Sequence, residues 1–507
     1  MPETGRRQQV SKVGAALAKA RLGVWALIFT VLAAAAPLTV IAGGATAGFA
    51  VTGSTGIPLG YVVVAVLLGV FSIGYVAMSR QIVNAGAFYT YITKGLGRPV
   101  GVAAAFVAVL AYNTMQTGLY GGFGVVLATF MSSEFGVSYP WWWWWALLGW
   151  LLILVLGGRR IEVNGLVLSV LLVAEIVVAL VYAAVQVTHP AGGHLSYTTL
   201  SPGNLVGAGL GAALATAIAG FVGFEGTAVF SEETKNPQKT VARATYLALL
   251  IIGVAYGFCA WAMSVATGPD KIVARSVTDG SELIFNLAGP YVPAVLIFLG
   301  HLLFITSLFA ALLAFHNTAA RYFFALGREG VLWNVLGRTN PKTKAPTAGS
   351  FLQSGIGVAV IGLYALTGWD PYTKMFFWLT VLGGLGVLIL MAVTSVAVLA
   401  YFTRRVNRRH AGVGRGVIAP AVAAVGLGGV LYVTVAQFAV LLGVQATSSL
   451  RWQLPALYAA AAMVGFGWAL VLRDRQPVVY ARIGRGAHSV VDEHADGPAL
   501  RVAGGWK

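Results

Sequence analysis

The feature that most constrains this chain is a succession of apolar stretches that are long enough, or nearly long enough, to cross a membrane as helices. Twelve such stretches occur, near residues 24–50, 58–78, 101–130, 141–157, 164–187, 205–230, 244–266, 293–324, 348–367, 374–402, 417–443 and 455–472. Only 10% of the 507 residues are charged, whereas a soluble domain carries about 25%. We therefore predict an all-α membrane protein with twelve transmembrane helices, the fourth of which is short unless it begins within the tryptophans at 141–145.

The net charge of +17 raises the question of a nucleic-acid partner, which the placement of the cations excludes. With a cytoplasmic N-terminus, 29 of the 33 Lys and Arg residues fall in inner segments. The four outer ones are Lys271, Arg275, Lys374 and Arg451. This bias follows the positive-inside rule and predicts a multi-pass protein of the plasma membrane with both termini in the cytoplasm. The first stretch is too long for a signal peptide and is read as a retained span.

Two of the predicted spans carry residues that interrupt a helix. Span one contains Pro37, which lacks an N–H, followed by Gly43 and Gly44. Span six contains three glycines in the seven residues 220–226, around the carboxylate of Glu225. Broken helices in lipid are tolerated where they line a cavity or face other protein. Packing of small residues against neighbouring helices is the competing reading.

The two interruptions fall at equivalent places in two groups of five helices, which is typical of an inverted repeat. The predicted organisation is a cytoplasmic N-terminal segment, two five-helix repeats, a final helix pair and a weakly ordered cytoplasmic tail. Their bounds are 1–23, 24–187, 205–402, 417–472 and 473–507. Ends of half-helices then meet near the midplane, where freed N–H groups suit a carboxylate and freed carbonyls suit a cation.

Three segments resemble the amino acid-polyamine-organocation superfamily of permeases. The first runs from Ser79 to Tyr91 and on to Gly97-Arg98-Pro99, with a Tyr-x-Tyr element. The second is Gly223-Phe224-Glu225 followed by residues 232–237, Glu-Glu-Thr-Lys-Asn-Pro. The third is the loop from Arg321 to Gly330. Together they extend the resemblance over about residues 20 to 475.

This resemblance implies the leucine-transporter fold with broken helices 1 and 6, alternating access, and uptake or exchange of amino acids or polyamines. One departure is that the usual Gly-x-Gly-Ile of span one is replaced by Ala36-Pro37-Leu38-Thr39. Which backbone amides would hold a substrate carboxylate is therefore left open.

Two carboxylates lie inside predicted spans, where an ionisable group is costly and by default a functional candidate. Glu225 either accepts a substrate ammonium, transfers a proton or gates, or it caps freed N–H groups of the broken helix. In the family, an acidic residue here occurs in carriers of polyamines and cationic amino acids. Glu175 in span five either exchanges a proton during the cycle or makes a structural hydrogen bond. The resemblance implies a Lys on this helix in several proton-driven members of the family, so a Glu here departs from that pattern.

The coupling ion is predicted to be a proton or sodium. Thr306 and Ser307 lie side by side in span eight, where the resemblance places a cation site, although such hydroxyls often bond only to helix backbone. The candidates for the coupling ion are Glu175, Thr306 and Ser307.

A polar stripe in span three, Asn113, Gln116 and Tyr120, follows helical spacing and predicts a face toward the bundle interior, for substrate contact or for bonds between helices. Phe221 or Phe224 is a candidate aromatic lid. The predicted substrate-binding residues are Thr39, Ala42, Gly43, Gly44, Asn113, Gln116, Tyr120, Phe221, Gly223, Phe224, Glu225 and Trp378.

No phosphate-binding Gly-x-x-x-x-Gly-Lys-Ser/Thr loop occurs, so transport runs on ion gradients or exchange. We predict a secondary active transporter for amino acids or related amines, with an exchanger of the same fold or a non-transporting sensor as alternatives. No enzymatic activity, cofactor or metal is expected. The predicted partners are the small-molecule substrate, a proton or sodium ion and the lipid bilayer.

Overall fold

The computed structural model describes residue 17 and residues 22–137, 141–158, 161–207, 209–404 and 411–486, with the backbone alone for 161–168. Most of the predicted N-terminal segment and residues 487–507 of the predicted tail lie outside the described residues. Within the described part the regular structure is helical, apart from one isolated bridge between Leu22 and Thr234. The all-α prediction is confirmed.

Eleven of the described helices have the length and composition to cross a membrane. In chain order they are α1 with η1 and α2 (Val24–Ala35, Thr39–Ala45, Thr46–Thr52), α3 (Ile57–Ser79), α5 (Arg98–Phe135), α7 (Ile161–Thr188), α9 with α10 (Leu210–Phe221, Gly226–Val229), α11 (Pro237–Thr267), α14 (Ala294–Arg328), α15 (Thr347–Thr367), η7 with α16 (Pro371–Phe377, Trp378–Thr403), η8 with α18 (Gly414–Ile418, Ala419–Ala436) and α20 (Leu450–Arg475).

The fourth predicted span corresponds to the shorter apolar helix α6 (Trp142–Gly157). Its 16 residues reach about 24 Å, short of a hydrocarbon core of about 30 Å. Trp141 and Trp144 at its start are half exposed, as side chains at a membrane interface are. Twelve spans therefore stays a prediction, with eleven helices of full length beside this short one.

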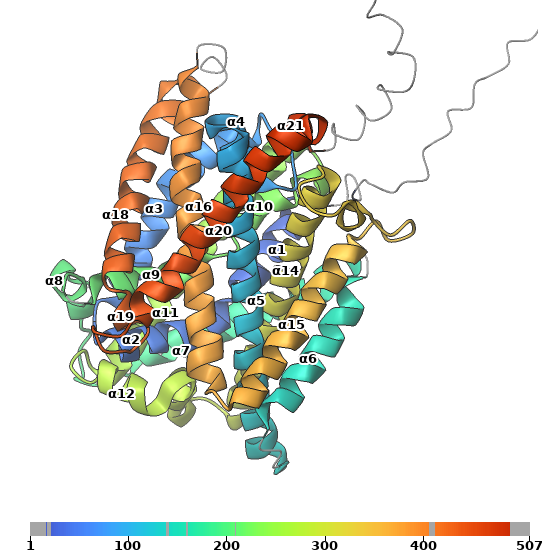
Figure 1. Ribbon diagram of the computed structural model, residues 1–507. Helices are drawn as coiled ribbons and strands as arrows, with labels where there is room; N and C mark the ends of the chain where they lie inside the picture. Colours follow the sequence, from blue (N-terminus) through green and yellow to red (C-terminus); the bar gives the residue numbers. More distant parts are fainter. Residues whose placement is uncertain are drawn as a thin grey trace, which may run out of the picture.

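Figure 1 shows the long helices packed side by side. Two short helices, α4 (Ala87–Leu96) and α21 (Pro477–Arg482), lie at one end of the bundle, which we call the α4/α21 end. The short helix α12 (Ile272–Asp279) lies toward the opposite end. The remaining short α-helices among the described residues are α8 (Pro202–Leu205), α13 (Leu283–Ala288) and α19 (Phe438–Leu441).

Helices α5 and α16 pack against each other at the centre of the bundle through glycines. A β-carbon on Gly383 would lie 2.9 Å from the carbonyl oxygen of Ala111, and one on Gly121 would lie 2.5 Å from that of Pro371 in η7. Any larger residue would push the backbones apart. Close approach through small residues replaces the hydrophobic effect, which does not drive helices together in lipid.

Two buried ion pairs hold the segment after α10 at the α4/α21 end. The Arg321 guanidinium lies 2.7 Å from the Glu233 carboxylate, and Arg328 lies 2.8 Å from Glu232. The backbone N–H of Leu22 donates to the carbonyl of Glu233, which ties the start of α1 to the same segment. These contacts join the ends of α1, α10 and α14.

The described part of the chain after α20, up to Gly486, docks on the α4/α21 end, whereas the sequence predicts a weakly ordered tail from residue 473. The Glu329 carboxylate, 1% exposed, accepts bonds from the N–H groups of Gly484 and Gly486 at 2.6 and 2.7 Å. The Tyr89 hydroxyl of α4 donates to it as well, at 2.5 Å. Burial raises the pKa of the Glu329 carboxyl, and these donors together with the Arg328 guanidinium oppose that rise. The polar, Gly-containing composition of the segment after α20 does not predict that it binds the Glu329 carboxylate.

Replacing Glu329 with alanine is expected to release the segment that follows α20. Three donors lose their acceptor, and a loss of about 2 kcal/mol raises the undocked population about thirtyfold. Limited trypsin digestion of the purified protein, read by mass spectrometry, should then give faster cleavage after Arg482. Asp474→Ala, an exposed carboxylate beside Arg473, is the control. Equal cleavage of wild type and Glu329→Ala would contradict the assignment of Glu329 as the anchor.

Candidate functional site

The first predicted span is interrupted directly after α1. This helix ends at Ala35, Ala36 takes a left-handed conformation with φ of 42°, and Pro37 cannot continue the hydrogen-bond ladder. The chain resumes in the π-helical η1, which contains Gly43 and Gly44. The break thus falls at Ala36 and Pro37 rather than at the two glycines.

The groups freed by this break have partners on three other helices. The Leu38 N–H donates to Glu175 Oε1 of α7 at 2.6 Å. The Ser307 hydroxyl of α14 donates to the same oxygen at 2.7 Å and accepts from the Thr39 hydroxyl at 3.0 Å. The Tyr256 hydroxyl of α11 donates to the Ala35 carbonyl at 2.7 Å. The structure therefore brings Glu175 and Ser307 together at the break.

Thr306, the third candidate for the coupling ion, lies outside this network. Its hydroxyl donates to the carbonyl of Leu303, three residues earlier in α14. This is the local bond that the sequence left open as the alternative for hydroxyls in span eight. Of the neighbouring pair, only Ser307 contacts Glu175 in the structure.

The second break lies between α9 and α10. Gly223 has a φ of 122°, which side chains rarely adopt, and its β-carbon position lies 2.6 Å from the β-carbon of Ala34. The fully buried Glu225 carboxylate accepts from the Gly223 N–H at 2.9 Å and from the Tyr112 hydroxyl at 2.8 Å. The Tyr75 hydroxyl donates to the Glu225 carbonyl at 2.8 Å.

The two breaks are built in the same way. Each has one buried carboxylate that accepts a freed N–H, Glu175 at the first and Glu225 at the second. Each also has one tyrosine hydroxyl that donates to a carbonyl of the break, from Tyr256 and Tyr75 respectively. Buried polar backbone groups of the breaks are thereby paired with side chains.

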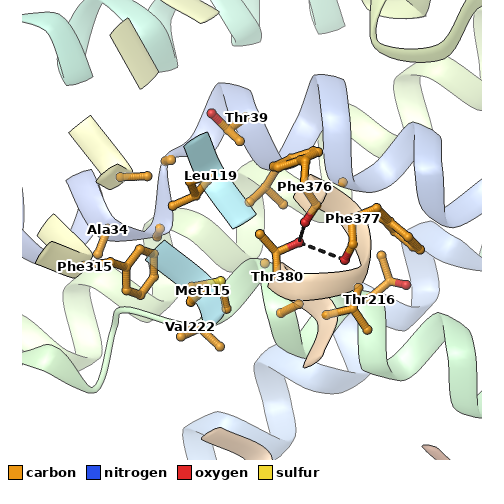
Figure 2. A pocket seen from close by; sticks show the side chains of 18 residues that line it. Ala34, Thr39, Met115, Leu119, Thr216, Val222, Phe315, Phe376, Phe377 and Thr380 are labelled. Carbon is orange, nitrogen blue, oxygen red and sulfur yellow. Dashed lines mark hydrogen bonds between the residues drawn. The ribbon is translucent and has the colours of Figure 1, made fainter. Parts of the chain in front are cut away.

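A cavity of about 60 Å³ lies between the two breaks (Figure 2). Its lining comes from α1, η1, α5, α9, α14, η7 and α16 and from Ala36 and Val222 of the breaks, and is mostly apolar. The three hydroxyl-bearing residues on it are Thr39, Thr216 and Thr380. The Thr380 hydroxyl donates to the carbonyls of Phe376 and Phe377, as the dashed lines in Figure 2 show. No described lining residue carries a charge.

Two of the predicted substrate-binding residues, Thr39 and Gly44, line this cavity. Gly43 and Ala42 belong to the same π-helical segment, and Gly43 faces Tyr372 and Phe376. Gly223 and Glu225 form the second break beside the cavity without lining it.

The polar stripe of α5 is occupied by bonds within its own helix and with other helices. Gln116 donates to the Tyr120 hydroxyl and accepts from Gln353 of α15, both at 2.9 Å. The Asn113 amide donates to the carbonyl of Val109. The residues of α5 that line the cavity are instead Met115 and Leu119.

The aromatic candidates pack away from the cavity in this structure. Phe221 contacts the rings of Tyr61 and Tyr256, and Phe224 contacts that of Phe71. The Trp378 indole donates to the carbonyl of Leu442.

Sequence reasoning missed most of the apolar lining. Phe315, Phe376 and Phe377 supply the aromatic surface, and Met115 and Leu119 face them from α5. An apolar residue in an apolar helix carries no signal that separates a cavity wall from lipid or packing. Thr216 and Thr380 are polar exceptions in the lining, and neither is among the predicted substrate-binding residues.

Two interrupted helices on either side of an apolar cavity are typical of membrane transport proteins. A family model described as amino acid permease matches residues 22–466. The chain belongs to this family of the amino acid-polyamine-organocation superfamily, as its sequence motifs predict.

Three relatives illustrate the similarity. A branched-chain amino acid permease of Lactococcus lactis is 23% identical over 61% of this chain and 68% of its own length. A low-affinity putrescine importer of Escherichia coli is 25% identical over 60% of this chain and 67% of its own length. A methylthioribose transporter of Bacillus subtilis is 29% identical over 30% of this chain and 32% of its own length.

Gly223→Ala is expected to destabilise the second break strongly. The new methyl group both meets Ala34 and requires a backbone conformation that L-residues avoid, at about 1–3 kcal/mol for each effect. The thermal midpoint of the detergent-purified protein should fall. Gly226→Ala is the matched control, because its β-carbon would lie 3.6 Å from Val31, an ordinary contact. Equal midpoints for the two variants would be inconsistent with strain at Gly223.

Proposed function

We propose that this transporter is a secondary active permease of the plasma membrane that moves amino acids by alternating access. The carrying observation is the small cavity bounded by two broken helices. The proposal includes the five-plus-five inverted repeat, in which the first break in α1/η1 and the second in α9/α10 are equivalent. The positive-inside rule supports an α4/α21 end that faces the cytoplasm.

The preferred substrates in this proposal are small neutral amino acids with aliphatic side chains. The apolar lining from Met115, Leu119 and Phe315 supports this class, because it offers no group for a second charge. The substrate's own amino and carboxyl groups would be met by backbone groups at the breaks. The name of the branched-chain amino acid permease among the relatives favours the same class.

Diamines form the second candidate class, favoured by the putrescine importer among the relatives and by the carboxylate of Glu225. In the structure this carboxylate is engaged by Gly223 and Tyr112 and does not line the cavity. A diamine would therefore require Glu225 to leave both donors. The loss of these two hydrogen bonds disfavours diamines as substrates relative to neutral amino acids.

Glu175 is the proposed site of ion coupling, and the proton is the proposed ion. Its carboxyl joins α7, α14 and the first break through Leu38 and Ser307. Gain or loss of a proton there would change the bonds that hold the break, and so couple the ion to the movement of α1. An exchanger without ion coupling and a non-transporting sensor remain the alternatives that flux measurements separate.

Uptake into proteoliposomes tests the substrate class. With an inward proton gradient, leucine, valine and alanine should accumulate and putrescine should not. One coupled charge at about 100 mV supports a concentration ratio near fiftyfold. Accumulation of putrescine alone would show that diamines, and not neutral amino acids, are the substrates. The absence of both uptake and exchange would indicate a non-transporting sensor.

Ala311→Leu is expected to narrow the cavity from α14. The KM for leucine should rise by about tenfold or more, and that for alanine by less, because the added atoms occupy the space of the larger side chain. Ala460→Leu, the same change at an exposed position of α20, should leave both values unchanged. A uniform loss of uptake for both substrates would argue against this cavity as the side-chain site.

Glu175→Gln is expected to abolish accumulation driven by a pH gradient while substrate exchange persists. Glutamine fills the same space and still accepts a bond from Leu38, but it cannot release a proton. Ser307→Ala should shift the pH dependence of uptake, whereas Thr306→Ala, its neighbour without a bond to Glu175, should not. Proton-driven accumulation that survives Glu175→Gln would exclude Glu175 as the coupling site.

A further inference from the structure

Two hollows meet on the exposed side of α3 and α11, apart from the cavity between the two breaks. The first is an apolar groove of about 520 Å³, lined by residues of both helices from Val62 to Gly69 and from Tyr246 to Trp261. The second is a pocket of about 360 Å³ lined by the end of α3, by Tyr246 and by the start of the α18 segment. Tyr246 lines both, so the pocket continues into the groove.

The smaller pocket is cationic. Arg80 at the end of α3 and Arg415 in η8 both line it. Its described lining contains no aspartate or glutamate, and neither guanidinium pairs with a carboxylate among the residues that the structure describes. By contrast, Arg321 and Arg328 at the same end are each paired with a glutamate. Two unpaired guanidinium groups in one pocket suit an anion with phosphate geometry.

The groove has the position and length of a lipid chain. Gly69 lies eleven positions before Arg80, or about 16 Å along the helix, which is roughly half of a hydrocarbon core of about 30 Å. A β-carbon on Gly69 would meet no atom within 4 Å, so the groove is open at that depth. The apolar side chains of Val66, Leu250 and Val254 on its walls are 60% or more exposed, as lipid-facing residues are.

We propose that the pocket and groove together bind one anionic phospholipid, with its phosphate between Arg80 and Arg415 and an acyl chain along α3 and α11. The charge of the pocket and the apolar character of the groove match the two parts of such a molecule, and their junction at Tyr246 matches the glycerol level. A free phosphate would use the pocket alone and leave the groove without a role.

The site joins three segments that belong to different parts of the bundle. Helix α3 packs on both α11 and α18, and η8 carries Arg415 at the start of α18. A lipid held there links α18 to α3 and α11 through its headgroup. Lipid binding is measured without transport, so a failure of lipid binding and a failure of the proposed transport function can be told apart.

Native mass spectrometry of the full-length protein in detergent, titrated with dioleoyl-phosphatidylglycerol or dioleoyl-phosphatidylcholine, tests this site. Wild type should bind the anionic lipid more tightly, by about fivefold for each arginine. The double variant Arg80→Gln/Arg415→Gln should lose this preference. Lys239→Gln/Arg338→Gln removes two exposed charges that line neither hollow and should retain it. A preference that survives the first pair of changes, or that both pairs abolish equally, overturns the headgroup assignment.

Gly69→Leu fills the groove without a clash and should weaken binding of both lipids severalfold. Gly355→Leu, an equally open position on α15, is its control. Glycerol phosphate, which carries the headgroup charge without chains, should fail to displace the bound phospholipid at equal concentration. If glycerol phosphate competes as well as the lipid and Gly69→Leu binds normally, the pocket is a site for a soluble phosphate and the lipid proposal is wrong.

Discussion

A backbone N–H or C=O in the hydrocarbon of a membrane has no water to bond with, and leaving it unpaired costs several kcal/mol. Two helices of this protein are interrupted in the middle of the bundle. The side chains around the interruptions form hydrogen bonds with the backbone groups that are freed there. Glu175 and Glu225 accept the freed N–H groups, and tyrosines on α11 and α3 reach the freed carbonyls. The position of α7, α3, α5 and α14 around the breaks is the geometry that these bonds require.

The same bonds connect stability with movement. Each break is held by groups from two or more helices. In the alternating-access cycle that we propose, the backbone at the breaks would have to change against these bonds. A carboxylate is suited to this position because its hydrogen-bonding capacity changes when it gains a proton. The remaining surface of the cavity is mostly apolar, so in the proposed function its shape rather than a charge would select the substrate.

The fold could be predicted from the sequence because a lipid bilayer constrains the sequence of a protein that crosses it. The features used were the length of the apolar stretches, the interruptions by Pro37 and by the glycines around Glu225, and the placement of the cations. The site was readable only in part. Glu175 and Ser307 could be predicted as site residues because polar groups inside a span need partners, and in the structure they form a hydrogen bond with each other. Gln116 and Tyr120 attract attention for the same reason, yet their partners are each other and Gln353. Phe315 and Phe376 carry no such signal, since an apolar side chain is equally at home in packing, lipid or a cavity wall.

The docking of Gly484 and Gly486 on Glu329 has a consequence for how the molecule is made. Tyr89 and Glu329 leave the ribosome before the glycines that complete their cluster, which follow Glu329 by 155 and 157 residues. The α4/α21 end therefore stays incomplete until the segment that follows α20 has been synthesised. A fusion partner joined directly after α20 would remove this last step of assembly, whereas one joined beyond residue 486 would leave it in place.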